Sequence, residues 1–118
     1  DDLANYIPAR ISAILIPIAS FLCGYGFKDS LRIACRDGRK HESPNSGIPE
    51  AAMAGALGVQ LGGTSTYQGE VAEKPFIGDI QNPLTLESID MSIKIMYVAS
   101  ILFMVCGIGF IICLKYWF

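Results

Sequence analysis

The sequence predicts an all-α membrane protein in which two apolar helices flank a cytoplasmic segment of helices and loops. Three observations support this class. The 118 residues are 52% hydrophobic and only 17% charged, with a mean hydropathy of +0.42. Two long stretches carry no charge, and a polar stretch rich in Gly and Pro separates them. We therefore expect three parts, with boundaries at residues 1–27, 28–94 and 95–118.

The C-terminal apolar stretch, Ile95–Leu114, has the composition of a membrane-spanning helix. Its 20 residues lack any charge, which matches the ~20 residues that cross a bilayer core. Tyr97 lies near one end and Trp117 beyond the other, where interfacial aromatic residues are expected. Thr85 is a suitable N-cap. The helix should therefore begin near Leu86, before the membrane.

The first apolar stretch, Ile11–Phe27, allows two interpretations. Its 17 uncharged residues are few for a crossing, and they include Pro17, Gly24 and Gly26. The segment could span the bilayer. It could also be bent or re-entrant, since Pro and Gly permit a break in a helix.

Basic residues are concentrated just after the first apolar stretch. Lys28, Arg32, Arg36 and Lys40 recur every four residues, as a stripe along one helix face would. The positive-inside rule places residues 28–94 in the cytoplasm of a multi-pass cell-membrane protein. The stripe is either a basic face next to the membrane or part of a polyanion site. The net charge of −2 and the lack of a basic arm predict no nucleic-acid partner.

The stretch from Ser43 to Glu50 predicts a turn that leads into a helix. Two prolines argue against a regular helix here, whereas Asn, Ser and Gly favour turns. We expect the helix to start at Pro49 and to end at Gly62 and Gly63. Its N-terminus would offer free N–H groups to an anion, and its Ala- and Gly-rich face would pack on a helix or a flat ligand.

Two stretches of the sequence resemble the CobD/CbiB family: DDLANYIPARISAILIPIA and RDGRKHESPNSGIPEAAMAGALGVQLGGTSTYQGEVAEKPFIGD. The resemblance covers roughly residues 1–95 and corresponds to the C-terminal portion of longer membrane proteins. It implies cobalamin biosynthesis by an ATP-dependent acid–amine ligase. That enzyme would join adenosylcobyric acid to aminopropanol or its phosphate. The implied cofactors are ATP and Mg²⁺.

The chemistry of such a ligation suggests roles for the polar residues, because it needs cations near phosphates, Mg²⁺ ligands and a proton acceptor. The expected catalytic residues are His41, Lys40, Glu50 and Lys74, with His41 as the base. The expected metal ligands are Asp2 and Asp79, with Asp1 beside Asp2. The expected substrate and phosphate contacts are Ser43, Asn45, Ser46, Gly47, Arg36, Arg10 and Asn5. We expect most of these residues to meet in one pocket at the cytoplasmic edge of the membrane.

One conflict concerns Arg10. If residues 11–27 span the bilayer, Arg10 lies about 25 Å from Lys28 and on the opposite face from the other site residues. A bent segment would return Asp2, Asn5 and Arg10 toward the site.

Expected partners are the corrinoid, the aminopropanol, membrane lipid, and either the N-terminal helices of a longer protein or a second chain. Two other classes compete with the ligase. One is a non-catalytic membrane sensor on a related scaffold. The other is a transporter fragment, which the lack of ionisable residues within Ile95–Leu114 disfavours.

Overall fold

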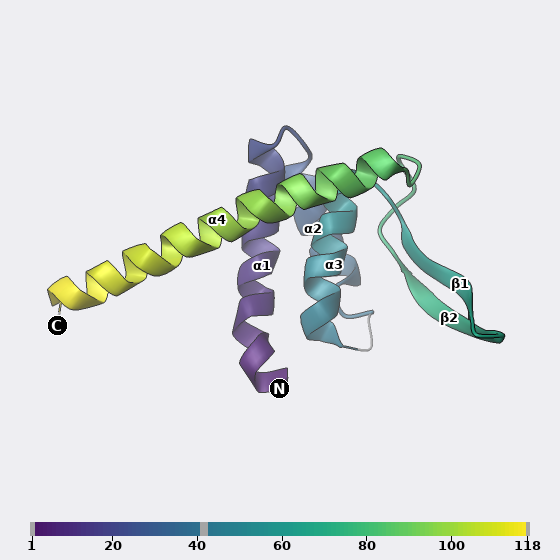
Figure 1. Ribbon diagram of the computed structural model, residues 1–118, viewed down its shortest axis with the longest axis horizontal. Helices are drawn as coiled ribbons and strands as arrows, with labels where there is room; N and C mark the ends of the chain where they lie inside the picture. The colour runs from purple at the N-terminus through teal and green to yellow at the C-terminus, as the bar shows by residue number, and fades with distance from the viewer. Residues whose placement is uncertain (1, 41–42, 118) are drawn as a thin grey trace.

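The computed structural model describes residues 2–40 and 43–117, and the predicted base His41 lies outside this part. The described chain is mostly helical (Figure 1). Its elements are α1 (Asp2–Leu22), α2 (Phe27–Asp37), α3 (Pro44–Leu57), β1 (Leu61–Tyr67), β2 (Glu70–Ile77) and α4 (Leu86–Trp117).

The expected all-α class is wrong in one respect, because β1 and β2 form an antiparallel hairpin that projects away from the helices (Figure 1). Gln68 and Gly69 connect the strands with φ values of 51° and 83°. Two positive φ values in a two-residue loop match the twist of a hairpin. Gly62 does not end a helix. It lies inside β1 with φ of 100°, where a Cβ would collide with the Pro75 carbonyl oxygen.

Helix α1 is continuous, so the break that we considered at Pro17 does not occur. The chain reverses after α1 instead, around Gly24 with φ of 89°. The Ser20 hydroxyl donates a hydrogen bond of 3.2 Å to the Gly26 carbonyl oxygen and thereby ties the end of α1 to this turn. Helix α2 then runs back beside α1 (Figure 1).

Helix α3 begins at Pro44 rather than Pro49 and ends at Leu57, where Gly58 adopts φ of 68° as a left-handed C-cap. Pro44 occupies the first turn, where its missing N–H has no helical partner to lose. The small residues of α3 pack against neighbouring helices. A Cβ at Gly55 would collide with the Asp29 carbonyl oxygen of α2, so glycine allows this close approach.

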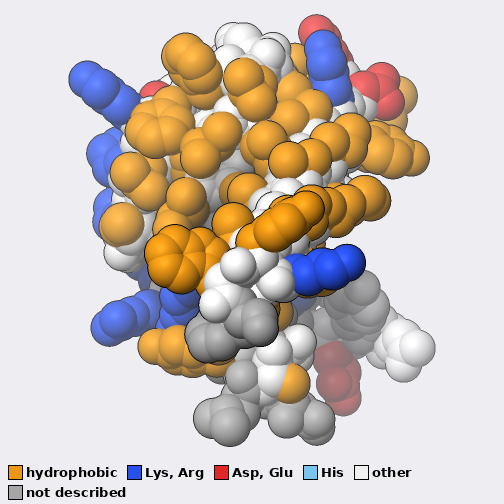
Figure 2. All heavy atoms as spheres, turned by 90° about the vertical axis from the view of Figure 1, so that its left-hand side faces the viewer, with side chains coloured by type: hydrophobic (Ala, Val, Ile, Leu, Met, Phe, Trp, Pro, Cys, Tyr) orange, Lys and Arg blue, Asp and Glu red, His pale blue; other side chains and the backbone are white. Residues whose placement is uncertain are grey.

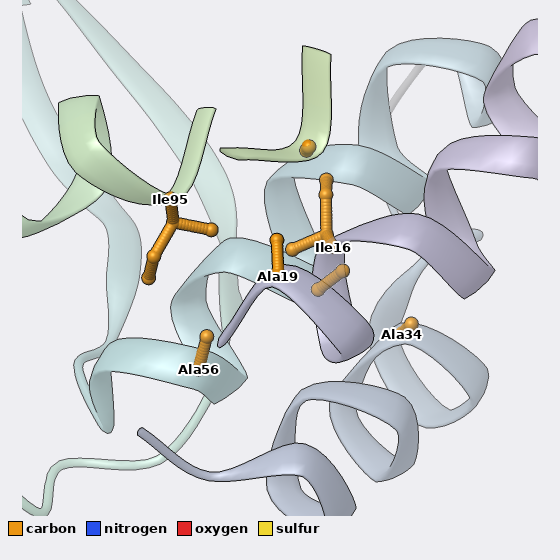
Figure 3. Packing of buried hydrophobic residues seen from close by; sticks show 7 residues of the cluster. Ile16, Ala19, Ala34, Ala56 and Ile95 are labelled. Carbon is orange, nitrogen blue, oxygen red and sulfur yellow. The ribbon is translucent and has the colours of Figure 1, made fainter. Parts of the chain in front are cut away.

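Two small apolar clusters hold the helices together. Figure 3 shows the first, where Ile16 and Ala19 of α1 meet Ala34 of α2, Ala56 of α3 and Ile95 of α4. The second cluster joins α2 and α3 to the base of the hairpin, and it contains Ile33, Ala51, Ala54, Val59 and Ile77.

The start of α4 is confirmed at Leu86. The Thr85 hydroxyl accepts a bond of 3.4 Å from the Ser88 N–H, and the Ser88 hydroxyl accepts one of 3.2 Å from the Thr85 N–H. This reciprocal pair caps the helix. By length and composition, α1 and α4 are both candidate membrane spans. The share of the apolar stretch that is buried is 33% in α1 and 6% in α4.

Candidate functional site

An open polar groove of about 510 Å³ lies between the N-terminal half of α1 and the first turns of α3. Helix α2 carries the chain back along α1, so that the start of α3 lies beside the N-terminal half of α1. Helices α1 and α3 therefore form the two walls. The groove is lined by Asn5, Pro8, Ala9, Ser12, Ser43, Asn45, Ser46 and Pro49.

Arg10 and Asn45 connect the two walls of this groove. The Arg10 Nη1 atom donates a hydrogen bond of 2.9 Å to the Asn45 Oδ1 atom. The Arg10 guanidinium also lies 3.9 Å from the centre of the Tyr6 ring, in cation–π geometry. The N-terminus of α3 presents the positive end of a helix dipole at the same place. The groove thus combines a guanidinium, side-chain donors and a helix N-terminus, which together suit an anionic group.

A second polar cluster surrounds Asp37 at the end of α2. Arg36 donates two bonds to the Asp37 carboxylate, at 2.9 and 2.7 Å. The Lys40 Nζ atom lies 2.9 Å from the same carboxylate, and the Gly78 N–H donates a bond of 2.8 Å. These contacts, above all those with Arg36, hold the pKa of Asp37 well below its usual range although the side chain is 0% exposed. The cluster fixes the exit of β2 onto α2.

Asp79 belongs to this second cluster. Its two carboxylate oxygens lie 2.9 Å from Arg36 Nη1 and 3.1 Å from Arg32 Nη2. The two guanidinium groups lower the pKa of Asp79, Arg36 more than Arg32. Both oxygens therefore face cations, which is a poor arrangement for a Mg²⁺ ligand. Within the described ranges, no three His, Cys, Asp or Glu residues are grouped so as to hold a metal.

The structure divides the predicted site residues between these two places. The groove is lined by Asn5, Ser43, Asn45 and Ser46, and Arg10 lies beside it, bonded to Asn45. The ion-pair cluster holds Arg36, Lys40 and Asp79. Three further residues lie elsewhere: Gly47 buried and Glu50 half-buried on α3, and Lys74 exposed on β2. The expectation of a single pocket is thus corrected to two polar clusters.

Other outcomes follow from the element bounds. Asp2 begins α1, at the same end as the groove. Lys28, Arg32 and Arg36 share α2, as the four-residue spacing predicts, and Lys40 lies just beyond its end. Asp37 was not among the residues predicted from the sequence. Its only local signal was an acidic residue within a basic stretch.

The chain matches the family model described as CobD/Cbib protein over residues 1–96. The cobalamin biosynthesis protein CobD of Geobacter metallireducens is 53% identical over 102 residues, covering 86% of this chain and 32% of that protein. The cobalamin biosynthesis protein CobD of Leptospira interrogans is 50% identical, and the cobalamin biosynthesis protein CbiB of Salmonella typhimurium is 49% identical. Both matches also cover 86% of this chain and 32% of the relative.

The chain therefore spans about a third of the length of these curated relatives. No solved structure matches it. The family match covers most of the chain, including both walls of the groove and the Asp37 cluster. This chain belongs to the CobD/Cbib family.

Proposed function

We propose that this chain is part of a membrane enzyme of cobalamin biosynthesis. The reaction is an ATP-dependent ligation that joins the carboxylate of adenosylcobyric acid to the amine of aminopropanol or its phosphate. The names of the relatives support the pathway, and the resemblance to the family supports the reaction. The observation that carries the site assignment is the Arg10–Asn45 contact at the N-terminus of α3.

The groove would bind a phosphate of one of the substrates. Arg10 would neutralise phosphate oxygens, while Ser43, Ser46 and Asn45 would donate hydrogen bonds at the start of α3. A volume of about 510 Å³ suits a drug-sized ligand. The corrinoid is larger, so only its reacting side chain would enter the groove.

In the proposed reaction, the carboxylate accepts a phosphoryl group from ATP, which leaves as ADP. The amine then attacks the activated carbonyl carbon, loses a proton, and displaces phosphate as the amide forms. His41 is the proposed proton acceptor. Lys40 and Lys74 are proposed to stabilise charge on the phosphates, and Glu50 on α3 to help hold Mg²⁺.

Mg²⁺ is the proposed companion of ATP, where it would neutralise charge on the phosphates. Asp2 fits this role better than Asp79, because Asp79 already faces Arg32 and Arg36. Asp2 begins the helix that forms one wall of the groove.

We place residues 28–94 on the cytoplasmic side, where ATP is available. The basic residues that follow α1 support this orientation through the positive-inside rule. Helix α4 exposes large apolar side chains along most of its length, including Phe103, Phe110 and Trp117. These side chains would contact membrane lipid or further helices of the longer protein.

The full-length protein in detergent or vesicles provides the test. We expect ADP release that requires both the corrinoid acid and the amine, with an amide as the product. A membrane sensor would bind the corrinoid without consuming ATP. ADP release that is independent of both substrates, or amide formation without ATP, would contradict the proposal.

A further inference from the structure

We infer that α1 does not cross the bilayer but lies along its surface, with an apolar stripe of side chains in contact with lipid. The helical body formed by α1, α2 and α3 then docks on one membrane face, and α4 alone crosses. This inference concerns a lipid-binding surface and does not depend on the proposed reaction.

The first argument comes from the charged neighbours of α1. Ala34 of α2 packs with Ile16 and Ala19, so α2 lies beside α1 and not beyond its end. The same helix carries Arg32 and Arg36, which pair with Asp79 but whose side chains remain 46% and 42% exposed. If α1 crossed the bilayer, these exposed guanidinium groups would lie inside it. Exposed charges in the bilayer interior are strongly disfavoured.

The second argument is the direction of α4. Figure 1 shows that α4 crosses α1 steeply, and that its C-terminal half extends beyond the rest of the molecule. Two helices that cross steeply cannot both run along the bilayer normal. The apolar stretch of α4 is only 6% buried, whereas that of α1 is 33% buried. The mean hydropathy is 2.5 for α4 and 1.3 for α1. Helix α4 is therefore the one that crosses, and α1 lies close to the membrane plane.

The third argument is the exposed face of α1. Ile7, Ile14 and Phe21 are 65%, 61% and 66% exposed. A spacing of seven residues places these three side chains on one helix face. Ala9 and Ile16 on the other face are buried, and the groove opens beside Ala9. Lipid would therefore contact one side of α1, while the polar groove remains open to water on the other.

The surface from which α4 emerges has the composition of a membrane-docking face. Figure 2 shows this surface, with hydrophobic side chains over much of its upper part and mainly Lys and Arg, with some Asp and Glu, at its edges. Phe27 and Leu31 of α2 are also exposed, next to Lys28 and Arg32 in the sequence. Apolar side chains bordered by basic ones are typical of surfaces that bind anionic lipid.

The depth of this contact follows from the length of the crossing. Ile95 packs beside Ile16 in the first apolar cluster, so the uncharged stretch of α4 begins at the level of α1. From Ile95 to Leu114 a helix measures about 30 Å, the thickness of the hydrocarbon core. The exposed stripe of α1 would then enter only the outer ~5–10 Å of the bilayer.

Single tryptophans at the three stripe positions test the inference. The variants Ile7→Trp, Ile14→Trp and Phe21→Trp would be made in full-length protein without other tryptophans. Each would be placed in phosphatidylcholine and phosphatidylglycerol vesicles with bromine near the headgroup or near the chain ends. We expect all three to be quenched alike, and more by the shallow bromine. In a crossing helix, position 14 would instead lie about 10 Å deeper than positions 7 and 21, which would be near opposite interfaces.

Ile108→Trp in α4 is the matched control, and it should be quenched more by the deep bromine. Deeper quenching at position 14 than at positions 7 and 21, no quenching of the stripe, or shallow quenching at position 108 would each overturn the inference.

A second measurement determines on which side of the membrane each end of α1 lies. Cysteines at Ala4 and Lys28, in a full-length variant without other cysteines, should react with an impermeant maleimide from the same side of sealed vesicles. Reaction from opposite sides would show that α1 crosses.

Discussion

Replacing Asp37 with alanine is expected to lower the free energy of unfolding by about 3 kcal/mol, at the lower end of the range for breaking a buried ion pair. The Asp37 side chain is 0% exposed, and it binds Arg36, Lys40 and the Gly78 N–H. Its loss would leave the buried Gly78 N–H without an acceptor. We place the effect at the lower end because Arg36 and Lys40 are half exposed. Thermal unfolding of the full-length protein in detergent measures it.

Asp79→Ala is the matched control. Asp79 also contacts Arg36, at 2.9 Å, but its side chain is 39% exposed. Exposed ion pairs contribute about 0–1 kcal/mol, so this variant should unfold close to wild type. Equal destabilisation by the two substitutions would show that Asp37 is not the anchor of the β2 exit.

The contribution of Asp37 should also depend on pH. Arg36 and the Gly78 N–H hold the pKa of Asp37 well below its usual range. In the unfolded chain the pKa of this carboxyl is about 3.9. A carboxyl with a lowered pKa stabilises the folded state above the unfolded pKa and loses this effect as the pH falls further.

Asp37→Asn keeps an acceptor for Gly78 while removing the charge. The difference in melting temperature between wild type and Asp37→Asn should therefore be largest near neutral pH and should narrow below about pH 4. A gap that widens toward acid would refute this account.

Arg10→Ala is expected to lower kcat/KM of the full-length enzyme by about 10–100-fold. The Arg10 guanidinium donates a hydrogen bond of 2.9 Å to the Asn45 side chain at the start of α3. Losing a hydrogen bond to a charged group costs about 1.5–3 kcal/mol, and each 1.4 kcal/mol is about tenfold. Arg10→Lys should be intermediate, because lysine keeps the charge without the forked geometry.

Lys28→Ala provides the control for the loss of one positive charge. Lys28 lies in the first turn of α2, after the chain reverses, and is not among the residues that line the groove. We expect near-normal kcat/KM for Lys28→Ala. If it loses as much as Arg10→Ala, the effect comes from general electrostatics and not from the groove.

The sequence was sufficient for features that depend on local patterns. The uncharged stretch from Ile95 to Leu114 identifies α4, and the capping residue Thr85 gives its start. The four-residue spacing from Lys28 to Arg36 gives α2. In each case the physical signal lies within one or two helical turns.

Features that depend on distant pairing could not be read in this way. Arg10 meets Asn45 across 35 positions, and Asp37 meets Gly78 across 41. The hairpin had local signals in its positive-φ residues, Gly62 and the Gln68–Gly69 pair. They were missed because paired glycines also end helices. Only the close approach of Gly62 to Pro75 shows which role applies.

The claim that the groove binds a substrate phosphate is tested most directly by substrate protection of a thiol placed in the groove. Ser12 lines the groove but is not among the proposed phosphate contacts. In full-length protein with Ser12→Cys as its only cysteine, ATP with Mg²⁺ or aminopropanol phosphate should slow maleimide labelling in a saturable way. The same ligands should leave Lys28→Cys unaffected. Unchanged labelling of Ser12→Cys at ligand concentrations that saturate amide formation would contradict the assignment of the groove as the phosphate site.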